Sequence, residues 1–406
     1  MALLHLPLGA IDEAQLNRLV SARVAEARDI EYKRESYGAA DADHAEWLAD
    51  ITSFANTAGG DLLIGVAATK GVPTALSPLN GDPDNEILRL EQLARSGLQP
   101  RISNLEFKSV PISTGGYVLV VRIPRSFNPP HRVVRQGKGQ NRFWARSSAG
   151  KYEPNVDELR ALFTLAPQIA DRIRDFRADR VAQIVAGGAP VQLLDQTCLV
   201  MHVVPFAALD PRSLLALDVI EKNPSAFPPF ASTSARTWKI NIDGILRLSN
   251  ADEKAGAQRA YVQVYRSGIV ESVASSIASG ERPAGVPPRL LSSKIEGMML
   301  SSGVRYLKSL QEQGVEPPYV VLLSLVGVKG VAINVGLKAN WAEDDDISIL
   351  DRDQLHFGEV ILETVPRSIQ EMGVMIRPLI EQIANAAGRA RSSSFGPNGE
   401  YLHLFQ

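Results

Sequence analysis

Two carboxylates and a lysine stand close together in the segment Glu26-Ala27-Arg28-Asp29-Ile30-Glu31-Tyr32-Lys33. If Glu26 ends a helix and Glu31 lies in a strand, both carboxylates can converge on one cation. Mg²⁺ and Mn²⁺ prefer such hard oxygen ligands, and a metal held there can activate water for phosphodiester cleavage. Lys33 would then face the phosphate. The alternative is a solvated acidic helix end, in which Lys33 pairs with Glu31 or Glu35.

A second group of residues has the chemistry to contact phosphate. Residues 121–151 include eight Lys or Arg and no Asp or Glu, although the net charge of the whole chain is −2. Such a local cationic block can attract nucleic acid even on a nearly neutral protein. The candidate nucleic-acid-binding residues are His131, Arg132, Arg135, Lys138, Arg142, Trp144 and Arg146.

Two parts of this block allow alternative interpretations. If residues 142–146 form a strand, Arg142, Trp144 and Arg146 share one face and could bind phosphates and stack on bases. The alternative is a sheet edge protected by arginine, with Trp144 buried beneath it. His131 follows two prolines, and there a loop hydrogen bond is the alternative to a phosphate contact.

The acidic segment needs neighbouring elements to position it. Hydrophobic spacing predicts an amphipathic helix over residues 11–26 and a short strand over residues 30–34. A second helix is expected to begin at Asp43, with Glu46 completing a capping box, and to end at Gly59-Gly60, where Gly59 takes a positive φ. Residues 61–67 form an apolar run that predicts a central strand.

The glycine turn does not favour nucleotide binding. A phosphate cradle places a glycine-rich backbone before a helix, whereas the turn from Asn56 to Gly60 follows a helix and precedes a strand. The chain also has no G-x4-G-K-[ST] sequence. An ATP-binding signalling module is therefore the weakest of the functional alternatives.

The remaining pattern predicts two domains. In the first, strands are expected at 105–110, 117–123 and 142–146, and helices at 85–96 and 155–165. In the second, strands are expected at 197–205, 236–248, 260–273, 319–326 and 358–364, and helices at 212–222, 290–313 and 369–387. We place the first domain at 10–165, an arginine-rich connecting helix at 166–189, a C-terminal α/β domain of unassigned role at 190–392, and a tail at 393–406. In this tail Tyr401, Leu402, Leu404 and Phe405 could dock.

Composition points to an ordinary globular protein. Of 406 residues, 45% are hydrophobic and 22% are charged. The single Cys198 excludes an internal disulfide framework and fits a reducing cytoplasm. We read Cys198 and His202 as core residues of one strand, because no zinc-binding spacing exists. The chain begins without a secretion signal and has no apolar run of roughly 20 residues, so we expect a cytoplasmic protein without a membrane span.

The acidic segment and the glycine turn together resemble a known family. The pattern E-x4-E-[FY]-K in residues 26–33, followed by Phe54-Ala55-Asn56-Thr57-Ala58-Gly59-Gly60-Asp61-Leu62-Leu63-Ile64-Gly65-Val66, is similar to the Schlafen AlbA-type domain. Pro130-His131 and the later segment Asn141-Arg142-Phe143-Trp144-Ala145-Arg146-Ser147 are similar to a further family pattern, S-x-x-P-H followed by [YF]-x-R-x-[GS]. The resemblance covers about residues 10–165. It implies an α+β fold with a mixed sheet and flanking helices, followed here by the second domain.

The resemblance also implies functions. In nuclease members of the family, the two acids matching Glu26 and Glu31 bind divalent metal, and the lysine matches Lys33. Their third acid has no counterpart, because Ala67 and Ala68 follow the Ile64-Gly65-Val66 strand. We therefore expect an RNA-binding protein for tRNA-like substrates, with Mg²⁺- or Mn²⁺-dependent endoribonuclease activity in phage defence as one hypothesis. A non-catalytic DNA- or RNA-binding regulator with a degenerate acidic site is the other, and a homodimer fits either.

Overall fold

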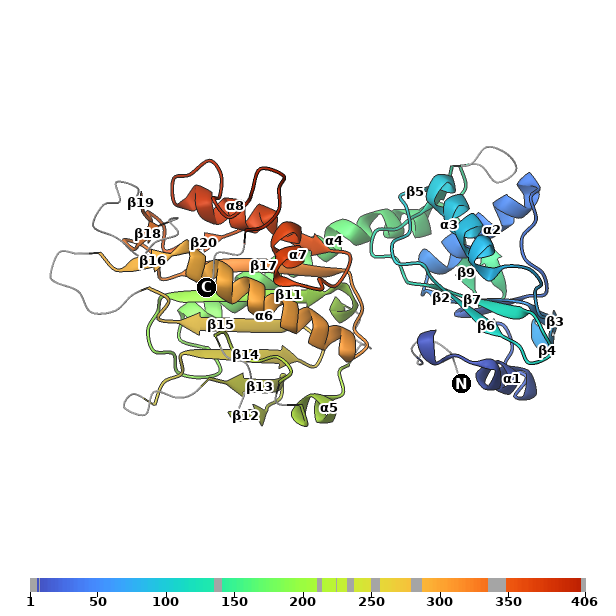
Figure 1. Ribbon diagram of the computed structural model, residues 1–406, viewed down its shortest axis with the longest axis horizontal. Coiled ribbons are helices and arrows are strands. Elements are labelled where there is room, and N and C mark those ends of the chain that lie inside the picture. The colour runs from blue at the N-terminus through green and yellow to red at the C-terminus, as the bar shows by residue number, and fades with distance from the viewer. Residues whose placement is uncertain are drawn as a thin grey trace. The chain divides into compact units, whose positions relative to one another are not determined.

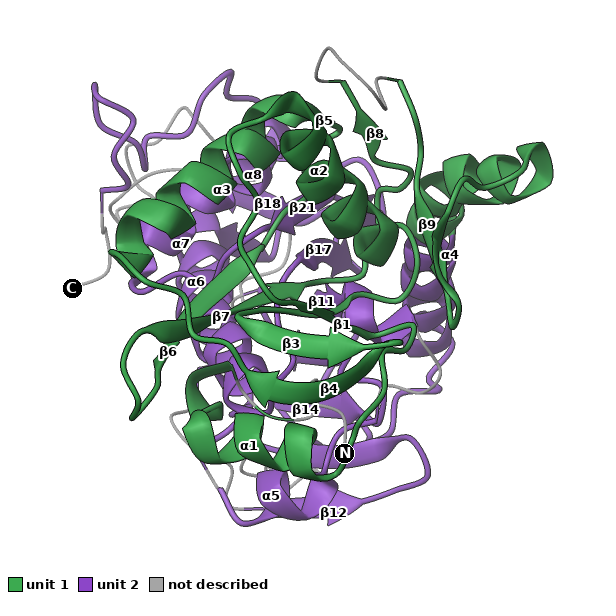
Figure 2. Cartoon of the chain, turned by 90° about the vertical axis from the view of Figure 1, so that its right-hand side faces the viewer, with its two compact units in different colours: residues 1–171 green, residues 172–406 purple. Residues whose placement is uncertain are grey.

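The computed structural model describes residues 6, 8–134, 141–209, 214–223, 225–231, 237–249, 256–278, 287–334 and 348–402. The chain forms two compact units, Met1–Asp171 and Arg172–Gln406 (Figure 2). Both units combine helices with multi-stranded sheets, which confirms the predicted α+β class.

The first unit is built on a four-stranded sheet with the order β1-β2-β7-β6. Its strands are β1 Ile30–Lys33, β2 Gly60–Ile64, β7 Tyr117–Ile123 and β6 Glu106–Pro111. Strand β1 pairs with β2 in parallel, whereas β2–β7 and β7–β6 are antiparallel, so the sheet is mixed, as predicted. Strand β2 is central and buried along its whole length, which confirms the prediction from its apolar run.

Alternate side chains of this sheet pack on opposite faces. Leu62 and Ile64 of β2 pack with helices α2 Asp41–Ala55 and α3 Pro83–Gly97. Leu63, on the other face, packs in a cluster with α1 Glu13–Ser21 and the hairpin of β3 Val66–Thr69 and β4 Val72–Leu76. Figure 2 shows α2 and α3 on one side of the sheet, and α1 with β3 and β4 on the other.

The remaining elements of the first unit surround this sheet. They are η2 Leu8–Ala10, β5 Leu98–Gln99, β8 Arg132–Val133, β9 Ala145–Ser147, β10 Gly150–Tyr152 and the start of α4 Val156–Val185. Strands β9 and β10 form a hairpin, and β5 pairs with β8.

Three local predictions for this unit were wrong. Helix α2 begins at Asp41 with Ala40 as its N-cap and no side-chain capping bond, so Asp43 and Glu46 form no capping box. Helix α1 ends at Ser21, well before Glu26. Helix α4 continues through Pro167, where we expected two helices. A proline removes one helical hydrogen bond, and the long helix on either side of Pro167 tolerates that loss.

The second unit contains a large sheet in which every pairing is antiparallel among the described strands (Figure 1). The strand order is β12-β13-β14-β15-β11-β17-β20, and β21 also pairs with β17. Their bounds are β11 Cys198–Pro205, β12 Thr237–Ile240, β13 Gly244–Leu248, β14 Ala260–Tyr265, β15 Val270–Ser275, β17 Tyr319–Val326, β20 Gln354–His356 and β21 Val360–Leu362. A smaller sheet joins β16 Arg289–Leu291, β18 Ala332–Asn334 and β19 Ser348–Ile349.

Two stretches predicted as single strands are hairpins. Residues 260–273 fold back at Gly268, whose φ of +94° is left-handed, to form β14 and β15. The described part of the second stretch, residues 237–248, divides in the same way into β12 and β13, with residues 241–243 between them. The expected strand at 358–364 is the shorter β21.

The helices of the second unit are η3 Phe206–Leu209, α5 Leu217–Glu221, α6 Ser292–Glu312, α7 Ile369–Met375 and α8 Arg377–Ala386. We predicted α7 and α8 as one helix, but the helix is interrupted at Ile376, which is the C-cap of α7 and the N-cap of α8. In the tail, the hydroxyls of Ser394 and Tyr401 donate hydrogen bonds to Glu296 at 2.7 and 3.3 Å, so Tyr401 is docked as expected. Leu402 is exposed, and Leu404 and Phe405 lie outside the described residues. None of the described helices has the length and apolar character needed to cross a bilayer.

Candidate functional site

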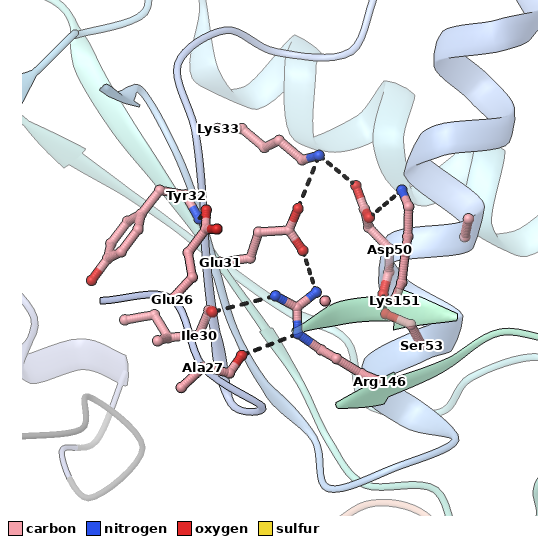
Figure 3. Close-up of polar contacts among 12 residues, drawn as sticks. Glu26, Ala27, Ile30, Glu31, Tyr32, Lys33, Asp50, Ser53, Arg146 and Lys151 are labelled. Carbon is pink, nitrogen blue, oxygen red and sulfur yellow. Dashed lines mark hydrogen bonds and ion pairs between the residues drawn. The ribbon is translucent and has the colours of Figure 1, made fainter. Parts of the chain in front are cut away.

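The acidic segment lies on a strand whose faces have opposite roles. Ile30 and Tyr32 point into the cluster around α1. By alternation, Glu31 and Lys33 point to the other face, toward α2. There the Lys33 ammonium lies 3.0 Å from Glu31 Oε1 and 3.1 Å from Asp50 Oδ2. Figure 3 shows the Lys33 ammonium between these two carboxylates.

Helix α2 contributes Glu46 and Asp50, which are four residues apart and therefore share a helix face. Asp50 is fully buried, and its Oδ2 accepts a 2.7 Å hydrogen bond from the hydroxyl of Tyr37. Burial and the neighbouring Asp50 raise the pKa of Tyr37 well above its usual value, which keeps this hydroxyl a donor. Glu46 is half exposed and accepts a 2.7 Å hydrogen bond from Lys33.

The β9–β10 hairpin contributes two further cations. Arg146 and Lys151 are directly opposite each other in its register, so their side chains share a face. Two like charges in that position repel. Carboxylates from two other elements offset the repulsion: Lys151 lies 2.6 Å from Asp50 Oδ1, and Arg146 pairs with Glu31 (Figure 3).

Arg146 is the most deeply held of these cations. Its side chain is only 3% exposed, and its guanidinium lies 4.4 Å from the centre of the Phe54 ring. Besides pairing with Glu31, it donates a hydrogen bond to the carbonyl of Ala27 at 3.2 Å and another to that of Ile30. Arg146 thus ties the hairpin to the start of β1.

These contacts leave Lys33 firmly protonated. Burial alone would lower the pKa of the Lys33 ammonium, but the carboxylates of Asp50, Glu31 and Glu46 outweigh burial and raise that pKa. The resulting network contains three cations and three carboxylates. They are Lys33, Arg146 and Lys151, with Glu31, Glu46 and Asp50.

Glu26 belongs to a different local structure. Its Oε1 accepts a hydrogen bond of 3.2 Å from the amide of Tyr32, and its own amide donates to the carbonyl of Gly71 at the β3–β4 hairpin. Glu26 therefore fixes the chain before β1.

This arrangement does not fit a resident divalent metal. The two oxygens of Glu31 already face Lys33 and Arg146, and cations at both positions repel a third. Ala67 and Ala68 lie in β3 and offer no carboxylate. Among the residues that the structure describes, no group of three or more His, Cys, Asp or Glu is arranged to hold a metal ion.

The cationic block does not form the predicted stripe. Strand β9 begins at Ala145, so Arg142 and Trp144 are outside it. Arg142 is exposed and pairs with Glu153, Trp144 packs against the core, and Arg146 is buried. Arg132 donates a 2.9 Å hydrogen bond to the side chain of Gln99. Arg135 and Lys138 lie outside the described residues.

His131 and the glycine turn support the fold. His131 is buried, its Nδ1 lies 2.8 Å from the carbonyl of Pro100, and burial lowers its pKa. The loop hydrogen bond offered as the alternative for His131 is thus present. Asn56 holds both sides of this region, because it accepts from the amide of His131 and donates to the carbonyl of Trp144. Gly59 has a φ of +73°, as predicted.

Sequence reasoning missed Asp50, Lys151 and Glu46 as members of the network. Asp50 carried a signal, because it is a lone acid in the apolar stripe of α2. Lys151 and Arg146 carried none that identified their partners, since Arg146 is 115 residues from Glu31.

Residues 26–155 match the family model described as Schlafen, AlbA_2. No curated protein matches. The DIP2311 protein from Corynebacterium diphtheriae has a similar structure, with 14% identity over 37% of this chain and 27% of that chain, at a TM-score of 0.26. The N-terminal domain of an ATP-dependent DNA helicase RecG-related protein from Nitrosomonas europaea shows 24% identity over 36% of this chain and 93% of that chain, at a TM-score of 0.27.

Proposed function

We propose that this protein binds nucleic acid, prefers tRNA-like RNA and does not hydrolyse it. The proposal starts from the match of residues 26–155 to the Schlafen, AlbA_2 family model. The family match carries the proposal, since domains of this family are associated with nucleic-acid binding. The cations left partly exposed by the fold support it. The side chains of Lys33 and Lys151 are 20% and 28% exposed, and that of Arg142 is 50% exposed.

We propose that the protein does not hydrolyse RNA because Glu31 is engaged in ion pairs. A carboxylate that already holds Lys33 and Arg146 is a poor ligand for a further cation. We therefore give Glu31 a positioning role, in which it orders Lys33 and the β9–β10 hairpin. With Glu31 in this positioning role, the site is better suited to regulation through nucleic-acid binding than to RNA cleavage.

Metal-dependent RNA cleavage is the second candidate. It is favoured by the contact of Glu31 with Lys33, which brings together two of the three residues that the family resemblance assigns to cleavage. A role in phage defence would follow from cleavage by analogy with the family.

The test is binding of the full chain to fluorescent tRNA, single-stranded RNA and DNA of matched length, measured by anisotropy at several salt concentrations. The logarithm of affinity should fall with that of salt by about 0.7 to 0.9 per phosphate contacted. Absence of salt-dependent binding at low ionic strength would refute nucleic-acid binding, and equal affinity for DNA would refute the RNA preference.

Incubation with tRNA and Mn²⁺, with and without EDTA, separates the two candidates. We expect intact RNA in both samples. EDTA-sensitive cleavage that disappears in Glu31→Gln would establish the second candidate instead.

A further inference from the structure

Two lysines in the network share two acceptors. The Lys33 ammonium lies 2.7 Å from Glu46 Oε1, and the Lys151 ammonium lies 3.9 Å from the same atom. Both also contact the carboxylate of Asp50, at 3.1 and 2.6 Å. The two ammonium groups are therefore close neighbours that converge on one oxygen of Glu46.

The two shared carboxylates differ in how firmly they are held. Asp50 is fully buried, and Tyr37 donates a hydrogen bond to it in addition to the lysines. The side chain of Glu46 is 49% exposed, and its described polar contacts are only those to the two lysines. Asp50 is thus a fixed support, whereas Glu46 can rotate into solvent.

Displacing Glu46 changes the charge of the site. With Glu46 in place, the three cations are matched by three carboxylates. Without it, Lys33, Lys151 and Arg146 face only Glu31 and Asp50, so one positive charge remains. Exposed ion pairs contribute about 0.2 to 1 kcal/mol, so the contacts of Glu46 can be exchanged for those of another anion.

We propose that Lys33 and Lys151 form a phosphate-binding site that Glu46 occupies in the free protein, and that a backbone phosphate displaces the Glu46 carboxylate when nucleic acid binds. This inference rests on the proposed function for the identity of its ligand. Phosphate suits the site because lysine ammonium groups act as compact point charges and donate to several oxygens of one anion. Glu46 then acts as an internal competitor.

The first test compares two variants that lose the same charge. Glu46→Gln removes the competitor. Glu35→Gln is the control, because Glu35 is exposed, lies two residues from Lys33, and pairs with neither lysine among the described contacts. We expect Glu46→Gln to bind tRNA about 3-fold more tightly than Glu35→Gln, the size set by an exposed ion pair. Equal affinities of the two variants would overturn the inference while leaving nucleic-acid binding intact.

Lys151→Gln tests the cationic side. It should weaken tRNA binding and lower the salt slope by about 0.7 to 0.9, because one phosphate contact is lost. An unchanged slope in a variant with wild-type circular dichroism would remove Lys151 from the site.

Inorganic phosphate provides a readout that does not depend on nucleic acid. Titration calorimetry should give a tighter phosphate Kd for Glu46→Gln than for Glu35→Gln, and Lys151→Gln should abolish the difference when combined with Glu46→Gln. Tighter phosphate binding without any tRNA binding would support the site and refute the proposed function. Equal phosphate affinities would refute the site itself.

Discussion

Replacing Arg146 with Met tests whether the buried ion pair holds the first unit together. Methionine keeps much of the length and apolar stem of the side chain but removes the charge and every donor. Glu31 would keep Lys33 at 3.0 Å but lose its second cation. The carbonyl of Ala27 would lose a 3.2 Å hydrogen bond, and Phe54 would lose the guanidinium over its ring.

The loss of stability expected for Arg146→Met depends on how deeply the Arg146–Glu31 ion pair is buried. Breaking one side of a buried ion pair destabilises a protein by about 3 to 5 kcal/mol. Because Lys33 still neutralises Glu31, we expect the lower end, about 3 kcal/mol. Arg142→Met is the matched control from the same cationic block. Its pair with Glu153 is exposed on both sides, so the loss should be at most about 1 kcal/mol.

Hydrogen exchange followed by mass spectrometry can assign the loss to one unit. Amides of β2 are buried, and a loss of about 3 kcal/mol should raise their exchange rate roughly 100-fold if they open with the whole unit. Arg142→Met should raise it by about 5-fold at most. Equal exchange rates of the β2 amides in Arg146→Met and Arg142→Met, or an equal loss of protection in the second unit, would show that the buried Arg146 ion pair does not hold the first unit together.

Three further predictions concern other sites. Gly59→Val should destabilise the first unit in urea, because φ is +73° and an added Cβ would lie 2.6 Å from a backbone nitrogen; wild-type stability would contradict this. Contacts with Arg180 and His202 outweigh burial and lower the pKa of Glu271 to about 2, below its value in the unfolded chain. The contribution of the Glu271 carboxylate to folding stability is therefore complete above about pH 5 and is lost as the pH falls toward 2. Glu271→Gln should therefore flatten the acid side of the stability curve of the second unit, and an unchanged curve would refute the link. Burial raises the pKa of Cys198 to about 12, so a thiol reagent at pH 8 should label it only after unfolding, and rapid labelling of native protein would show that the thiol is accessible.

Local patterns predicted much of the first unit correctly. The bounds of β7 follow from its apolar run, and Gly59 follows from the need to end α2 with a positive φ. Both features depend on residues within a few positions of one another. The missed hairpin at Gly268 also had a local signal, because a glycine after Ser267 interrupts an otherwise alternating stretch. There the regular alternation on both sides concealed the turn.

The candidate site depended on contacts that no local pattern contains. Glu31 and Lys33 were recognised from their spacing, but their chemistry is decided by Arg146 and Asp50, which come from a distant hairpin and another helix. Spacing alone leaves a carboxylate free to bind metal or to pair with a cation. Only the fold shows that cations occupy both oxygens of Glu31.

The cationic block illustrates the same limit for charge. Residues 121–151 contain no acid, yet several of their cations are neutralised by carboxylates from elsewhere in the chain. These pairs are Arg122 with Asp61, Arg142 with Glu153, Arg146 with Glu31, and Lys151 with Asp50. A local count of charges therefore overestimates the positive surface offered to nucleic acid. A phosphate can contact only those cations whose carboxylate partner it can displace. In the network around Lys33, the carboxylate that can be displaced is the exposed Glu46 rather than the buried Asp50.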